Sequence, residues 1–190
     1  MQIPHYFEDL DHLHINTEPD RAYYIPASRA GNYFLDREKS DRFFLLSGIW
    51  RFRYFQSVYD LPEDFWKQGV QEKEWKNVTV PAVWQSYGAD CNQYINTRYP
   101  FPVDPPFVPR ENPCGLYERT FEYYREESAP EVFINFEGVD SCFYLWLNGN
   151  FAGYSQVSHS TSEFCVTDLL REGNNRLTVL VLKWHGDNRS

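Results

Sequence analysis

One turn signal constrains the fold of this chain more than any other feature of the sequence. Asn148-Gly149 stands between two apolar runs, Cys142 to Leu147 and Asn150 to Tyr154. A two-residue turn of type I′ needs positive φ at both central residues, and Asn-Gly meets this need best. The pair therefore predicts a β-hairpin, and with it an antiparallel sheet.

Further segments with strand character surround this hairpin. They are Trp50 to Phe55, Val78 to Val80, Leu116 to Tyr124, Glu131 to Phe136 and Arg176 to Trp184. Helical signals are confined to residues 62–68, which Asp60 can cap, and to residues 167–172, which end at Gly173. The 15 Phe, 14 Tyr and 6 Trp suit a wide β core. We therefore expect an all-β protein, an antiparallel β-sandwich or jelly roll.

Two stretches fall outside this pattern. Residues 1–45 show no sustained period of 2 or 3.6, so we expect an extended N-terminal arm. Residues 100–113 hold six of the 12 prolines, which predicts a stiff loop outside any sheet because proline fixes φ and lacks an N–H donor. The apolar side chains of this loop suit docking on another surface or folding back over their own core, and both alternatives stay open.

Composition and charge exclude several classes of partner. The net charge is −9 and no block of Lys or Arg stands out, so we expect neither nucleic acid nor an anionic membrane as a partner. No apolar run approaches the ~18–20 residues that span a bilayer. Met1 to Leu10 shows no secretory signal, which favours a cytoplasmic location. The cysteines form no CxxC pair and are expected to be free thiols: Cys91, Cys114, Cys142 and Cys165.

Common catalytic motifs are absent from the sequence. It contains no P-loop, GxGxxG, GxSxG or HExxH pattern. Three histidines lie among carboxylates in the arm, but their spacing predicts no metal site: His5, His12 and His14. Glu137 and Asp140 flank a turn and are interpreted as solvated turn residues, and His159 has no evident orienting acid.

The segment from Asn92 to Tyr99 has the composition of a sugar-binding loop. Tyrosine rings can stack on pyranose faces, while amide and guanidinium groups can pair with sugar hydroxyls. An ordinary polar loop packed by two tyrosines explains the same composition. Both readings stay open on composition alone.

An ordered set of short motifs resembles the N-terminal sugar-binding domain of glycoside hydrolase family 2. The pieces are Leu46-Ser-Gly-Ile-Trp-Arg-Phe52, Val80-Pro-Ala-Val-Trp-Gln85, Tyr87-Gly88, Tyr94-Ile-Asn-Thr-Arg-Tyr-Pro100, Asn112-Pro-Cys-Gly-Leu-Tyr117, Phe136-Glu-Gly-Val-Asp-Ser141, Trp146-Leu-Asn-Gly149, Gly153-Tyr-Ser155, Ser162-Glu-Phe164 and Leu177 to Trp184. Together they cover about residues 45–184. The fourth piece and Val103-Asp-Pro-Pro-Phe-Val-Pro109 resemble the β-galactosidases of this family more than its β-glucuronidases or β-mannosidases.

The resemblance implies a galactose-binding-domain-like jelly roll over residues 46–184. Residues 1–45 would be an arm that contributes to subunit contacts, and residues 185–190 a tail or the start of a linker. In the family, immunoglobulin-like domains and a TIM barrel follow. Two glutamates of the barrel hydrolyse terminal β-D-galactosyl residues, as in lactose, with retention. This chain would lack both glutamates, so it is expected to have no catalytic residue and no activity alone.

One family binding residue falls inside the chain. By motif match Asn96 binds the galactosyl group, and no metal ligand is assigned. The parent enzyme is expected to use Mg²⁺ and Na⁺, and to assemble as a homo-oligomer around galactosides as substrates. The alternative is a free-standing carbohydrate-binding or interaction module. A gene that continues into the downstream domains favours the first hypothesis, and a stop codon soon after Ser190 favours the second.

Overall fold

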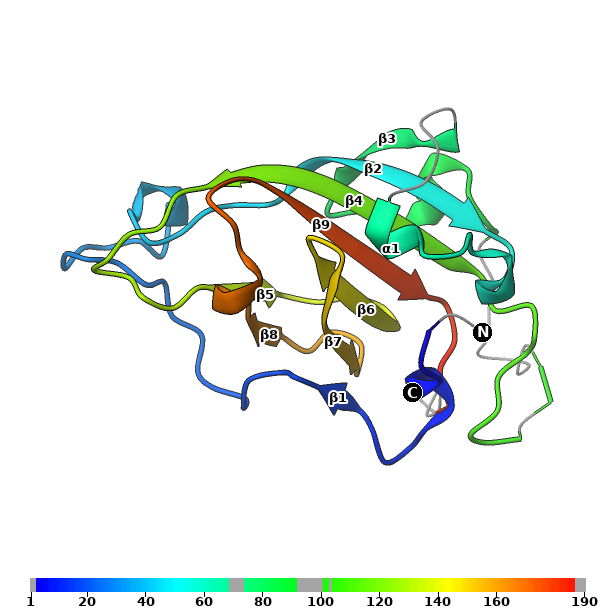
Figure 1. The fold of residues 1–190 in the computed structure, drawn as a ribbon. Helices are drawn as coiled ribbons and strands as arrows, with labels where there is room; N and C mark the ends of the chain where they lie inside the picture. Colours follow the sequence, from blue (N-terminus) through cyan, green and yellow to red (C-terminus); the bar gives the residue numbers. More distant parts are fainter. Residues whose placement is uncertain (1–2, 69–73, 92–100, 103, 187–190) are drawn as a thin grey trace.

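The computed structural model describes residues 3–68, 74–91, 101–102 and 104–186, and it confirms the all-β prediction. The strands are β1 (His14–Ile15), β2 (Gly48–Phe55), β3 (Lys76–Val80), β4 (Cys114–Tyr123), β5 (Phe133–Phe136), β6 (Cys142–Leu147), β7 (Asn150–Gln156), β8 (Ser162–Cys165) and β9 (Gly173–Leu182). Seven of them form an antiparallel sheet in the order β1-β7-β6-β9-β4-β2-β3, and β5 pairs with β8 in a second, small sheet (Figure 1).

Helical structure is confined to short pieces in the part of the chain that the model describes. They are the α-helix α1 (Phe65–Gln68) and the 3₁₀ turns Tyr6–Glu8, Arg37–Lys39, Val58–Asp60, Trp84–Tyr87 and Thr167–Leu169. The helix expected at residues 62–68 therefore begins later, at Phe65, and the turn expected at residues 167–172 is a single 3₁₀ turn. No helix among the described residues is long and apolar enough to cross a bilayer.

The predicted hairpin joins β6 to β7. Asn148 has φ 53° and Gly149 has φ 83°, so both turn residues are left-handed, as a type I′ turn requires. The Asn148 side chain also donates to the carbonyl of Leu169 over 2.9 Å and accepts from the backbone N–H of Arg176 over 3.0 Å. The turn is thereby fixed to the chain on both sides of the start of β9.

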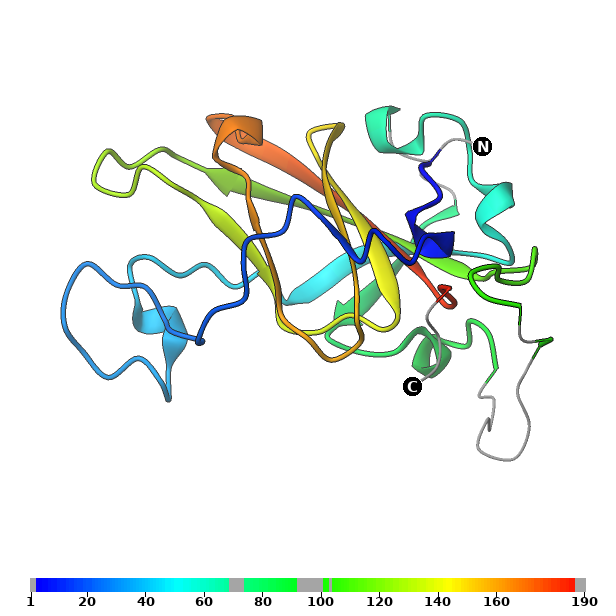
Figure 2. The same cartoon turned by 90° about the horizontal axis from the view of Figure 1, so that it is seen from below.

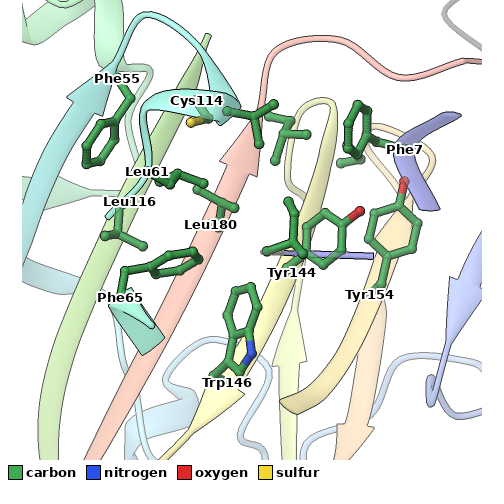
Figure 3. Packing of buried hydrophobic residues seen from close by; sticks show 14 residues of the cluster. Phe7, Phe55, Leu61, Phe65, Cys114, Leu116, Tyr144, Trp146, Tyr154 and Leu180 are labelled. Atoms are coloured by element: carbon green, nitrogen blue, oxygen red, sulfur yellow. The ribbon is translucent and has the colours of Figure 1, made fainter. Parts of the chain in front are cut away.

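The large sheet is apolar on both faces. Along its centre, Leu116 pairs with Leu180 and Leu180 with Tyr144, and these side chains share one face because directly opposite residues of neighbouring strands point to the same side. They belong to the first core cluster: Ile3, Phe7, Phe55, Val58, Leu61, Phe65, Cys114, Leu116, Cys142, Tyr144, Trp146, Tyr154, Leu180 and Leu182. Figure 3 shows Phe7 reaching this cluster beside Tyr154 and Tyr144.

The second core cluster occupies the opposite face. It comprises Trp50, Phe52, Val78, Trp84, Ile134, Phe143, Leu145, Leu147, Ala152, Phe164, Val166, Leu177, Val179 and Val181. Ile134 of β5 and Phe164 of β8 cover this face from the small sheet, while Trp84 covers it from a 3₁₀ turn. The two layers of the sandwich are therefore unequal, because a two-stranded sheet and a 3₁₀ turn together cover the second face of the large sheet.

Residues 1–45 hold more structure than their sequence pattern predicts. Phe7 is only 1% exposed in the first core cluster, and His14 of β1 pairs with Ser155 of β7. A Cβ at Gly153 would lie 2.5 Å from the carbonyl oxygen of Ile15, so β1 can approach β7 this closely only beside a glycine. A two-residue strand is too short to produce a period. The later arm forms a loop that extends away from the sheets (Figure 2), where Leu35 is 88% exposed.

The proline-rich loop packs partly on its own core, and docking on another surface stays a prediction. Its described residues lie outside the nine strands, as predicted, with a turn closed by the N–H of Phe107 on the carbonyl of Asp104 over 2.8 Å. Val108 packs against the first core cluster, whereas Phe107 is 61% exposed. The loop therefore folds back on its own core through one side chain and presents the preceding one to solvent.

Candidate functional site

The segment that the sequence singles out for sugar binding lies outside the described residues. It comprises residues 92–100 and includes Asn96. The structure describes the residues at its two ends, which are Cys91 and Phe101. Both ends lie beside the residues that follow β9, and this arrangement is the basis of the candidate site.

The first end is built from a tight turn and a buried ion pair. The 3₁₀ turn Trp84–Tyr87 ends at Gly88 with φ 74°, and Asp90 follows with φ 63°. The Asp90 carboxylate accepts from the Lys183 ammonium over 2.5 Å, and the two side chains are only 10% and 12% exposed. A pair this well shielded is screened little by salt, so it holds the chain near Cys91 to the end of β9.

The second end is held by an aromatic contact. The rings of Phe101 and Trp184 meet edge to face, with centroids 5.2 Å apart and planes at 72°. Trp184 is fixed in turn by Asn112, which is fully buried. The Asn112 carboxamide donates to the Trp184 carbonyl over 2.9 Å and accepts from the Trp184 N–H over 3.0 Å. The Asn112 side chain therefore bonds both the N–H and the carbonyl of Trp184 and fixes its backbone.

An aromatic platform lies next to the ion pair. The Trp84 ring lies so close to Gly115 of β4 that a Cβ there would be 2.8 Å from the ring. Tyr54 meets Trp84 edge to face at 6.0 Å. The Tyr54 hydroxyl and the Trp84 indole N–H are buried and have no hydrogen-bond partner among the described residues. Burial, with Asp90 nearby as the next cause, raises the pKa of Tyr54 to about 12, so its hydroxyl stays protonated at neutral pH.

A wide groove lies between the arm and the second core cluster. Arm residues such as Tyr23 and Tyr24 line one side, and Trp50, Trp84 and Val179 line the other. Three ion pairs cross between the arm and the sandwich: Arg21 with Glu163, Arg37 with Glu137, and Arg42 with Glu126. Each such partly exposed pair stabilises little by itself. These three glutamates are thus engaged in holding the arm.

The residues around the turn at Gly138 have different roles from those expected. Glu137 is not simply solvated, because it accepts from the Arg37 guanidinium and from the Tyr23 hydroxyl. The Arg37 hydrogen bond lowers the pKa of the Glu137 carboxyl. Asp140 accepts from the Ser158 hydroxyl over 2.5 Å. Asp140 is therefore a hydrogen-bond partner of Ser158, and no catalytic role is assigned to the neighbouring His159.

The arm histidines contact three separate partners. His5 lies 3.0 Å from Glu8, His12 lies 2.6 Å from Asp9, and His14 lies 2.9 Å from the Ser155 hydroxyl. Within the described part of the chain, no group of three or more His, Cys, Asp and Glu side chains could hold a metal ion. No ligand for the Mg²⁺ and Na⁺ expected of the parent is assigned among the described residues.

Sequence reasoning missed the residues that hold the two ends of the segment. Asp90 lies in no motif, and the motifs that include Asn112 and Lys183 assigned no role to these two residues. One signal was available, because a lysine that directly follows a long apolar strand needs either solvent or a carboxylate partner. The partner itself, 93 residues earlier in the chain, could not be identified without the fold.

The fold defines an unequal antiparallel β-sandwich, an architecture that domains of many different functions share. The chain belongs to glycoside hydrolase family 2, since the family model for the sugar binding domain matches residues 43–189. This match confirms the resemblance drawn from the ordered motifs.

Relatives with curated names are similar over nearly the whole chain. A β-galactosidase of Actinobacillus pleuropneumoniae is 48% identical over 185 residues, which is 97% of this chain and 18% of the relative. A β-galactosidase of Staphylococcus xylosus is 42% identical over 181 residues, or 94% of this chain and 18% of the relative. The chain therefore spans about a fifth of the length of these relatives.

Solved structures share the fold at low identity. A Bifidobacterium dentium β-glucuronidase matches with a TM-score of 0.52 and 23% identity, covering 72% of this chain and 19% of that protein. A Ruminococcus gnavus β-glucuronidase matches with a TM-score of 0.53 and 12% identity, covering 72% and 21%. At this identity the likeness establishes the fold alone.

Proposed function

We propose that this chain is the non-catalytic, N-terminal sugar-binding domain of a β-galactosidase. The complete protein would hydrolyse terminal β-D-galactosyl residues of lactose-type substrates with retention. The observation that carries the proposal is the 48% identity to a named β-galactosidase across 97% of the chain. The Tyr94 to Pro100 motif supports the same choice within the family.

The proposed contribution of this domain is one wall of the galactose pocket. Asn96 would hydrogen-bond the galactosyl hydroxyls, since a carboxamide offers two donors and an acceptor to adjacent hydroxyl groups. Two glutamates of a downstream TIM barrel would cleave the bond, about 5–5.5 Å apart as retaining chemistry requires. The complete protein would use Mg²⁺ and Na⁺, and no ligand for either ion is assigned in this chain.

The proposed partners of the domain are the downstream immunoglobulin-like and TIM-barrel domains, in a parent that forms a homo-oligomer. Large apolar side chains of the arm support a contact role, because Phe34 is 81% exposed and Phe44 is 66% exposed. Exposed apolar groups clustered on one segment are typical of interaction surfaces.

Substitution of Asn96 in the complete enzyme tests the proposal. Asn96→Ala should lower kcat/KM for a chromogenic β-galactoside by about 1–3 kcal/mol of transition-state binding, the usual cost of leaving a polar partner unpaired. Asn77→Ala, at an exposed position of β3, is the control and should stay close to the wild type. Full activity of Asn96→Ala would refute the role of Asn96 in the pocket.

A further inference from the structure

The N-terminal arm is attached to the sandwich in two different ways. Residues 3–18 are docked by burial and by strand pairing, since Phe7 is 1% exposed in the first core cluster and β1 pairs with β7. Among the described residues, none of 19–42 belongs to either core cluster or packs against one, and only Ser40 in this range is buried. Residues 19–42, called the strap from here on, are therefore held to the sandwich by polar contacts and not by apolar burial.

Three ion pairs of one polarity fasten the strap. They are Arg21 with Glu163, Arg37 with Glu137 and Arg42 with Glu126, and in each the arginine belongs to the strap. Arg42 also donates to the Ser128 hydroxyl over 2.8 Å. The pairs are partly exposed, as the side chains of Arg37 and Glu137 show with 32% and 52%, so salt screens them. Pairs of this kind are weak singly, and the attachment of the strap depends on the three acting together.

The strap also has contacts of its own that do not involve the sandwich. The Ser28 N–H donates to the Asp41 carboxylate over 3.0 Å, and the Ser40 hydroxyl donates to the Pro26 carbonyl. These contacts join the first and second halves of the strap, so that it can move as one unit. The strap carries one wall of the groove described above, through Tyr23 and Tyr24. Its movement would therefore widen the groove.

We propose that the strap is a salt-sensitive gate beside the groove. The three Arg–Glu pairs hold the gate closed, and their loss releases residues 19–42 while residues 3–18 stay docked. Raising the ionic strength from about 0.1 M to about 1 M shortens the Debye length from about 10 Å to about 3 Å, which weakens exposed ion pairs but not the burial of Phe7. The inference uses the contacts of described residues alone and does not rest on the proposed function.

Limited digestion of the complete protein with trypsin tests the gate, because trypsin cleaves after the strap arginines themselves. Cleavage after Arg37 and Arg42 is read by mass spectrometry and divided by the rate on a small chromogenic trypsin substrate. This ratio should rise roughly fivefold between the two salt concentrations, because release exposes the segment to the protease. The variant E126Q/E137Q/E163Q keeps the cleavage sites and should be cleaved at the high-salt rate under both conditions.

A matched control removes an ion pair elsewhere. Glu74→Gln breaks the partly exposed pair with Arg53 and should behave like the wild type. Cleavage of the wild type that does not depend on salt would overturn the proposal. Equal cleavage of the wild type and the triple variant at low salt would overturn it as well.

Hydrogen exchange separates release of the strap from loss of the whole arm. The Gln156 N–H donates to the Leu13 carbonyl over 3.0 Å, beside the pairing of β1 with β7. Exchange of the β7 amides should change by less than about twofold at high salt and in the triple variant, because residues 3–18 remain docked. If β7 exchange rises in parallel with tryptic cleavage, the arm detaches as a whole and the proposed division at residue 19 is wrong.

Discussion

Replacing Gly115 with alanine tests the aromatic platform next to the proposed site. An added Cβ would lie 2.8 Å from both the Phe52 and the Trp84 rings, and these side chains are 2% and 7% exposed. Neither ring can move into solvent, so overpacking should cost about 1–3 kcal/mol. Alanine would recover about 0.4–1 kcal/mol by restricting the unfolded chain. The expected net loss of unfolding free energy is about 1–2 kcal/mol.

Urea and thermal unfolding of the chain measure this loss. A change of this size should lower Tm by about 2–8 °C for a chain of this length. Gly138→Ala is the matched control, because its new Cβ would lie no nearer than 3.8 Å to His159, and it should change stability by less than about 0.5 kcal/mol. In a Trp84→Leu background the cost of Gly115→Ala should fall by about 1 kcal/mol. If Gly115→Ala is as stable as Gly138→Ala, the packing argument is wrong.

Two further predictions follow from the thiols and from the arm. Cys91 and Cys165 are exposed and should react rapidly with a thiol reagent, whereas the buried Cys142, whose pKa burial raises to about 12, should react only after unfolding; rapid reaction of every cysteine would contradict the packing. The Arg37 hydrogen bond lowers the pKa of Glu137, so the stability that this contact contributes is present above the ordinary carboxyl pKa of 4.5 and is lost as the pH falls through the lowered value. Proteolysis of the arm should therefore rise when the pH falls from neutral to below the lowered pKa of Glu137. The rise should be smaller in Glu137→Gln, because this variant lacks the contact at every pH while the ion pairs of Glu126 and Glu163 with the arm remain; an equal rise in the variant would contradict the prediction.

Local signals in the sequence were sufficient for the central strands. The Asn148-Gly149 turn and the alternation from Trp50 to Phe55 both follow rules that act over a few residues, and both predictions are confirmed. The sequence did not predict β1 or β8 as strands. The two residues of β1 are too few to show a period. Their positions depend on partners far along the chain, such as Ser155 for His14.

The candidate site shows the same division between local and long-range information. The motif around Asn96 is local, so it could be read from the sequence, and its role stays a prediction because it lies outside the described residues. The ion pair of Asp90 with Lys183 joins residues 93 positions apart and became visible only in the fold. No pattern of residue types specifies which distant carboxylate a buried lysine will meet.

The substrate preference of the complete protein tests the account most directly. Chromogenic β-galactoside, β-glucuronide and β-mannoside would be compared by kcat/KM, with the isolated 190-residue chain assayed in parallel. We expect the complete protein to prefer the β-galactoside by at least about 100-fold, because a site built for a hydroxyl group rejects analogues that leave its polar groups unpaired. We expect the isolated chain to show no turnover above background. Preference for the β-glucuronide, or turnover by the isolated chain, would contradict the account.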